Sequence, residues 1–81
     1  MPFSIKDRAR LAFNHTITAA EKAAAAAAVF EKAQVSAVSL PEETAENMVK
    51  EAKNRWDEAT EAFVDQRETL VELLREIARG N

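Results

Sequence analysis

The second half of the chain carries apolar residues at a strict seven-residue interval. One series is Val49, Trp56, Phe63, Leu70 and Ile77, and a second is Ala45, Ala52, Ala59, Gln66 and Leu73. Together they repeat with the alternating spacing of three and four residues that keeps one stripe of a helix against a partner helix. The sequence therefore predicts a helix of about five heptads with a continuous apolar seam.

Helix breakers are rare, since the 81 residues include one Gly and two Pro. Ser4 followed by Asp7 indicates a capped helix start, which predicts a first helix over about residues 4–36. Ser39 and Pro41 suit a cap and a first turn, so a connection is expected at about 37–40 and a second helix at about 40–79. Gly80 is expected to end that helix, and the single domain spans residues 1–81.

Two long helices joined by a short connection lie antiparallel, so the predicted fold is an all-α hairpin. With the connection as midpoint, residues whose numbers sum to about 79 would lie side by side, which pairs Trp56 with Ala23 and Val49 with Phe30. Large residues then face small ones in an Ala-rich, coiled-coil-like seam with closely spaced axes. The predicted seam consists of Ala20, Ala23, Ala27, Phe30, Val49, Ala52, Trp56, Ala59 and Phe63.

Three polar residues, Thr16, Gln34 and Gln66, fall close to the predicted seam. Buried there, an amide or hydroxyl needs a specific mate and would set the register of the helices. At the seam edge, the same side chains would simply reach water. The sequence leaves both interpretations open.

Apolar residues near the open end of the hairpin outnumber those that two helices can bury against each other. The surplus predicts a partner interface of Leu11, Val64, Leu70, Val71, Leu74, Ile77 and Ala78. Soluble monomers rarely leave such a patch exposed. The hairpin is therefore expected to be completed by oligomerisation or by another protein.

Residues that carry chemistry are scarce. The chain has no Cys and one His, and it lacks a Gly-rich phosphate loop or a nucleophile beside a base. No metal, cofactor, small-molecule substrate or enzymatic activity is expected. The longest uncharged apolar run, residues 23–30, is far below the roughly 20 residues of a membrane span, so a soluble chain in the cytoplasm or in a larger particle is expected.

Basic residues gather on the first helix, where Arg8, His15 and Lys22 are seven residues apart and share a face. They form the candidate nucleic-acid face. The net charge of −3 opposes attraction to phosphate backbones. A solvated basic face remains the alternative interpretation.

These features favour a non-enzymatic structural or assembly protein. In this hypothesis a rigid hairpin self-associates or docks in several copies onto a larger protein assembly. One alternative is a small regulatory or inhibitory module that binds a protein groove through a helix face. Another is an RNA-binding hairpin dimer.

Overall fold

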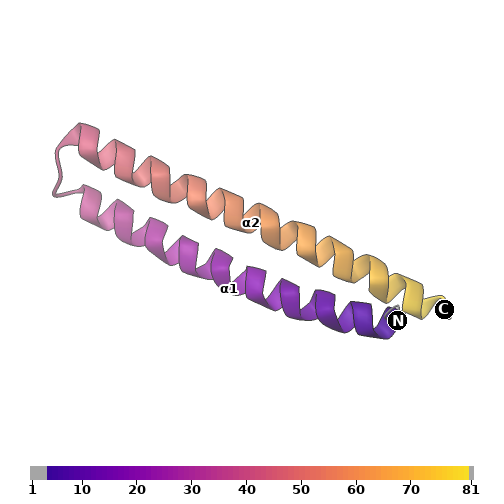
Figure 1. Ribbon diagram of the computed structural model, residues 1–81. Coiled ribbons are helices and arrows are strands. Elements are labelled where there is room, and N and C mark those ends of the chain that lie inside the picture. The colour runs from indigo at the N-terminus through magenta and orange to yellow at the C-terminus, as the bar shows by residue number, and fades with distance from the viewer. Residues whose placement is uncertain (1–3, 81) are drawn as a thin grey trace.

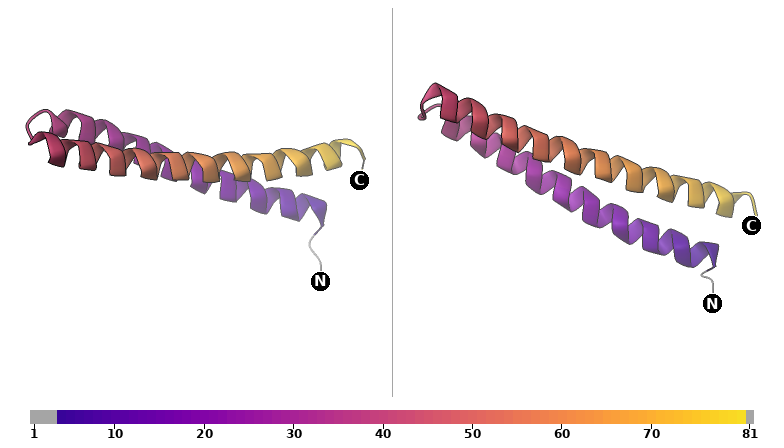
Figure 2. Two further views of the ribbon diagram at one scale, coloured as in Figure 1. Left: turned by 90° about the horizontal axis from the view of Figure 1, so that it is seen from above. Right: turned by 45° about the horizontal axis from the view of Figure 1, so that its top comes forward.

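The computed structural model describes residues 4–80, which form two antiparallel helices (Figure 1). Helix α1 spans Ile5–Ala37 and helix α2 spans Glu42–Ala78, joined by a connection over residues 38–41. No strand occurs in residues 4–80. The hairpin is a rod of 59 × 18 × 17 Å, and its two helices are inclined to each other, so that they cross when seen from above (Figure 2). The predicted all-helical hairpin is confirmed.

The start of α1 is fixed by a local cap. Ser4 has extended backbone angles, and its hydroxyl accepts a hydrogen bond of 3.2 Å from the backbone N–H of Asp7. This bond satisfies one of the free amides of the first turn, and the Asp7 carboxylate complements the positive end of the helix. The predicted cap is confirmed.

The start of α2 differs from the prediction. Pro41 is the N-cap, with φ −55° and ψ 145°, and no side chain caps this helix, so the predicted Ser39 cap is wrong. The ring of Pro41 disfavours helical angles at Leu40, which keeps the predicted first residue out of the helix. The first backbone bond of α2 instead joins the Ala45 N–H to the Pro41 carbonyl at 2.8 Å.

The end of α2 follows the predicted terminator. Gly80 has φ 88°, a left-handed conformation that side chains disfavour, and its N–H donates to the Ile77 carbonyl at 3.0 Å. Arg75 lies in the last turn, where a positive charge complements the helix dipole.

The buried and half-buried residues that face the other helix form one stripe on each helix, which we call the seam. They recur at alternating intervals of three and four residues on both helices. On α1 they are Ile5, Ala9, Ala12, Thr16, Ala19, Ala23, Ala26, Phe30, Ala33 and Ala37. On α2 they are Ala45, Val49, Ala52, Trp56, Ala59, Phe63, Gln66, Leu70, Leu73 and Ile77. The α1 stripe is mostly alanine, whereas the α2 stripe is mostly large.

An aromatic pair fixes the register of the two helices. The rings of Phe30 and Trp56 stack with centroids 5.4 Å apart and an interplanar angle of 28°, so facing residues have numbers that sum to 86. The predicted pairing of Phe30 with Val49 is wrong by one heptad. A shift of seven residues leaves the same residues in the seam, so the spacing alone does not distinguish the two registers.

The core of the hairpin is thin. Ala9, Ala12 and Leu73 form its buried cluster, against which Ile5, Leu70 and Ile77 pack. Within residues 4–80, no large side chain is fully buried. The ion pairs of this part of the chain join residues of the same helix and are exposed. Apolar contact along the seam therefore holds the two helices together.

The polar residues near the seam do not pair across it. Thr16 is buried, and its hydroxyl donates to the Ala12 carbonyl of its own helix at 2.7 Å. Gln34 is exposed and Gln66 is half-buried. The structure therefore favours the seam-edge interpretation for Gln34, and Thr16 is satisfied without a mate on α2.

The two helix starts generate a stability prediction. The Ser4→Ala variant loses its cap, and we expect it to lower the free energy of unfolding by about 0.5–2 kcal/mol. Ser39→Ala is the matched control, because its side chain caps neither helix. Thermal unfolding followed by circular dichroism measures both, and an equal loss in the two variants would contradict the cap assignment.

The register generates a second prediction. A double-mutant cycle of Phe30→Leu and Trp56→Leu should give a coupling energy of about 0.5–1.5 kcal/mol, because the two rings stack. The cycle of Phe30→Leu with Val49→Ala is the control and should be additive within about 0.5 kcal/mol. Denaturant unfolding measures both couplings. A larger coupling with Val49 would restore the register with a sum of 79.

Candidate interaction surface

The residues beside the seam divide into two flanks of the hairpin. Those immediately before a seam residue form the leading flank, and those immediately after it form the trailing flank. In an antiparallel pair, the leading residues of both helices lie on the same side of the hairpin. Turning one helix end over end reverses its chain direction, and this brings its leading residues to the side where those of the other helix lie. The grooves between the helices agree with this rule, since their lining residues are leading or seam residues of both helices.

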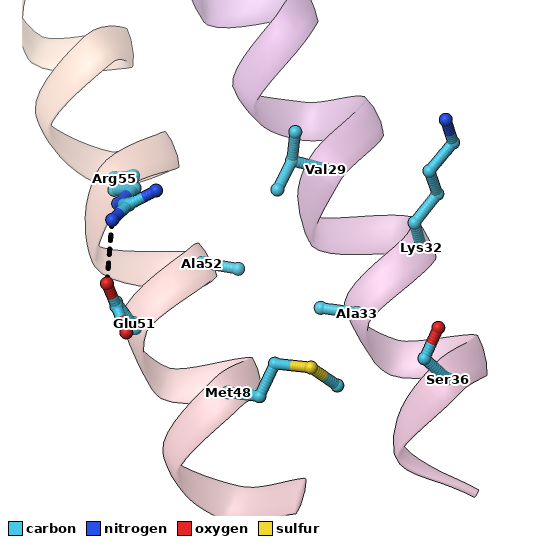
Figure 3. Close-up of a pocket in the computed structure, with 8 residues that line it drawn as sticks. All are labelled: Val29, Lys32, Ala33, Ser36, Met48, Glu51, Ala52 and Arg55. Atoms are coloured by element: carbon cyan, nitrogen blue, oxygen red, sulfur yellow. Dashed lines mark hydrogen bonds and ion pairs between the residues drawn. The ribbon is translucent and has the colours of Figure 1, made fainter. Parts of the chain in front are cut away.

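Near the connection, the leading flank carries a shallow groove of about 320 Å³ (Figure 3). Ala33 and Ala52 point toward each other from the two helices, and Met48 points toward α1. The Arg55 guanidinium pairs with Glu51 of its own helix at 2.7 Å, so the charged groups run along α2 and do not bridge the groove. Small facing side chains leave this groove open without enclosing a ligand site.

The candidate nucleic-acid face, Arg8, His15 and Lys22, lies on the leading flank. Arg8 and His15 line another groove, of about 340 Å³, together with Glu72 and Glu76 of α2. Carboxylates opposite the basic residues repel phosphate, so this flank gives no continuous positive track.

The predicted partner interface is divided among three places. Leu70 and Ile77 belong to the seam and pack against the buried cluster. Leu11 lies on the leading flank, in the groove with Arg8 and His15. The remaining four residues share the trailing flank, and they are Val64, Val71, Leu74 and Ala78.

Most trailing residues are apolar over the half of the rod nearest the termini. Two α1 residues there, Phe13 and Ile17, are 53% and 46% exposed; the sequence indicated that they are bulky apolar residues of the open end, but the predicted partner interface did not include them. Leu74 on α2 is 50% exposed. Phe13 and Ile17 each follow a seam residue of α1, so their place on the trailing flank can be inferred once the seam of α1 is known. The apolar trailing residues on this side of the connection are Phe13, Ile17, Ala20, Ala24, Ala27, Val64, Val71, Leu74 and Ala78, and Val38 lies apart from them in the connection.

Three trailing residues of this half are charged: Lys6 and Arg10 near the start of α1, and Arg67 among the apolar residues of α2. The guanidinium of Arg67 lies over the Phe63 ring, 5.4 Å from its centroid. In this position the aliphatic stem of Arg67 covers apolar surface while its charged end reaches the edge. Toward the connection, the trailing flank becomes charged, with Glu31, Glu46, Lys50, Lys53 and Asp57.

The predicted hairpin-seam residues all lie near the helix–helix contact. Ala52 is buried, and the others are half-buried: Ala20, Ala23, Ala27, Phe30, Val49, Trp56, Ala59 and Phe63. Ala20 and Ala27 are trailing residues at the edge of the seam. The most buried α1 residues, which include Ala9, Ala12 and Ala33, lay outside the prediction, which on this helix extended only from Ala20 to Phe30.

The hairpin exposes more surface than a compact protein of its mass. Its accessible surface is 6292 Å², whereas a compact monomer of 9.0 kDa exposes about 4,900 Å². The radius of gyration is 18.0 Å, against about 12 Å for a compact domain of this length. A rod of two helices thus leaves an excess of about 1,400 Å².

Two kinds of site receive no support in the part of the chain that the structure describes. His, Asp and Glu form no group of three or more placed to hold a metal ion there. Neither α1 nor α2 combines the length and the apolar character of a membrane-crossing helix.

Comparison of the chain with protein-family models, curated protein sequences and solved structures gives no match.

Proposed function

We propose that this chain is a non-enzymatic structural or assembly protein, a rigid helical hairpin that self-associates or docks in several copies onto a larger protein assembly. The observation that carries the proposal is the apolar trailing flank. Exposed Phe13, Ile17 and Leu74 lie there in one stretch with the half-buried Val64 and the exposed Val71. A contiguous apolar stretch of this kind marks a protein interaction surface.

The surface area supports association. The excess of about 1,400 Å² exceeds the roughly 800 Å² that each partner buries in a standard interface. The hairpin's own core includes little beyond alanines and Leu73. Burial of the trailing flank against a partner would add apolar contact that the isolated hairpin lacks. Because such a partner would stabilise the folded state, we expect it to stay bound whenever the chain is folded.

The coiled-coil-like packing along the seam also fits a structural role. Alanines on α1 let the helices approach, and the residues of α2 fill the space between them along most of the rod. Neither α1 nor α2 contains a Gly or a Pro. Such a hairpin presents its flanks at constant spacing, as a building element requires.

Polar groups that could support catalysis do not converge in the hairpin. The grooves of the leading flank are shallow, and their charged residues pair along a helix or face charges of both signs. Catalytic sites hold reacting groups in a recess that excludes water. This supports the non-enzymatic part of the proposal.

Molar mass in solution tests the proposal. Light scattering on a sizing column, from micromolar to millimolar chain, should give twice 9.0 kDa or a higher multiple. Circular dichroism on the same fractions should show a helical chain. A helical monomer throughout this range would contradict self-association, and it would favour a regulatory module that keeps the trailing flank for another protein.

A further inference from the structure

We infer that the trailing flank binds a second copy of this chain, with the two hairpins antiparallel and their apolar halves overlapping. The inference rests on the proposed function and names the partner and the geometry of its association. The product is a four-helix bundle over the overlap, and the two connections point in opposite directions.

The apolar part of the trailing flank occupies one end of the rod. On α1 it runs from Phe13 to Ala27, and on α2 it runs from Val64 to Ala78. The stacked pair of Phe30 and Trp56 places these two stretches beside each other, since trailing residues at one level have numbers that sum to about 87 or 88. A partner that fits this flank must therefore be apolar over about half the rod's length.

A side-by-side copy in the same orientation fits poorly. A two-fold axis along the rod would place α1 of one copy against α2 of the other at the same level. Glu31 would then face Asp57 of the second copy, and Phe13 would face Leu74. Like charges that face each other across an interface oppose association. Two large side chains that face each other would overpack the contact between the copies.

An antiparallel copy fits α1 residue by residue. A two-fold axis that crosses the rod between residues 18 and 19 pairs positions whose numbers sum to 37. It places Phe13 against Ala24, Ile17 against Ala20 and Arg10 against Ala27 of the second copy. Each pair joins a large side chain to a small one, the combination that lets helices interdigitate.

The same axis fits α2 without adjustment. The register of the hairpin places residue 69 of α2 at the same level as residues 18 and 19 of α1, so the axis passes residue 69. Residues of α2 that meet across the axis therefore have numbers that sum to 138. Leu74 then meets Val64 of the second copy, and Ala78 meets Thr60. Val71 meets the stem of Arg67, whose guanidinium is already held over Phe63.

Charge complementarity supports this orientation at the rim of the overlap. Lys6 and Glu31 also sum to 37, so each copy places an ammonium group beside a carboxylate of the other. Asp57 lies at this rim, and Lys53, nearer the connection, lies beyond the overlap. They keep their pairing of 3.3 Å within α2 and remain in solvent.

The area of the overlap is adequate for a stable dimer. The paired stretch of α1, about 27 residues at 1.5 Å per residue, is about 40 Å long. On a rod 18 Å wide, this gives a footprint of about 700 Å² on each copy, close to the roughly 800 Å² of a standard interface. The excess surface of the hairpin is large enough to supply this area.

Distances between spin labels test the orientation. The chain has no Cys, so Ser39→Cys gives a single labelling site in the connection. In the antiparallel dimer the two labels should be about 60 Å apart, from 21 residues on each side of the axis at 1.5 Å per residue. Pulsed electron paramagnetic resonance on the sized dimer measures this distance. A distance below about 30 Å would overturn the antiparallel arrangement while leaving self-association in place.

Two matched substitutions test the face. Ile17 and Leu11 are equally exposed, at 46% and 47%, but lie on the trailing and leading flanks. Ile17→Glu should weaken dimerisation about a hundredfold or more because it buries an unpaired carboxylate, and Leu11→Glu should leave the dissociation constant unchanged. Sedimentation equilibrium measures both constants, with helicity checked by circular dichroism. Equal effects, or a loss only with Leu11→Glu, would overturn the assignment.

A charge exchange tests the pairing itself. Lys6→Glu should weaken the dimer about two- to fivefold by opposing Glu31 of the second copy, and Lys6→Glu with Glu31→Lys should restore it. The double variant failing to recover would overturn the antiparallel register. A wild-type chain that stays monomeric would instead overturn the proposed self-association, so the two failures are distinct.

Discussion

Packing of small α1 side chains against larger α2 side chains is the constraint on which the hairpin depends. Ala9 and Ala12 against Leu73 form its buried cluster, and Phe30 against Trp56 sets its register. Alanine side chains let the two helices approach closely, but each buries little apolar area. Each alanine in the seam therefore makes only a modest hydrophobic contribution to stability. The exposed ion pairs lie within single helices and add little to the contact between them. A hairpin built this way gains stability from any further apolar contact.

The rod shape connects this thin core to the proposed role. Two helices cover one stripe of each other, and apolar residues that lie beside the stripe stay at the surface. Phe13, Ile17 and Leu74 are such residues. The opposite flank differs in character, because Arg8 and Glu76 line one of its grooves together. The hairpin therefore has one side suited to apolar association and one suited to water.

Local signals in the sequence predicted local structure well. Ser4 and Asp7 identified the start of α1 because a cap involves residues three positions apart. Gly80 identified the end of α2 for a similar reason. Ser39 failed as a cap, since Pro41 keeps the preceding residue out of the helix and moves the start past the predicted position. The sequence contains that constraint as well, in the residue before the proline.

Heptad spacing by itself determined that the second half of the chain forms one long helix and which of its residues face inward, because a side chain's direction on a helix depends only on its position in the repeat. The first helix followed from its cap and from the scarcity of Gly and Pro. The tertiary structure decided the register, because a shift of seven residues leaves the pattern unchanged and contacts between the helices, such as that of Phe30 with Trp56, distinguish the alternatives. It also decided which surface residues meet. Leu11 was grouped with Val71 from the sequence, but the two lie on opposite flanks. Which residues of two helices share a side depends on how the helices pack against each other.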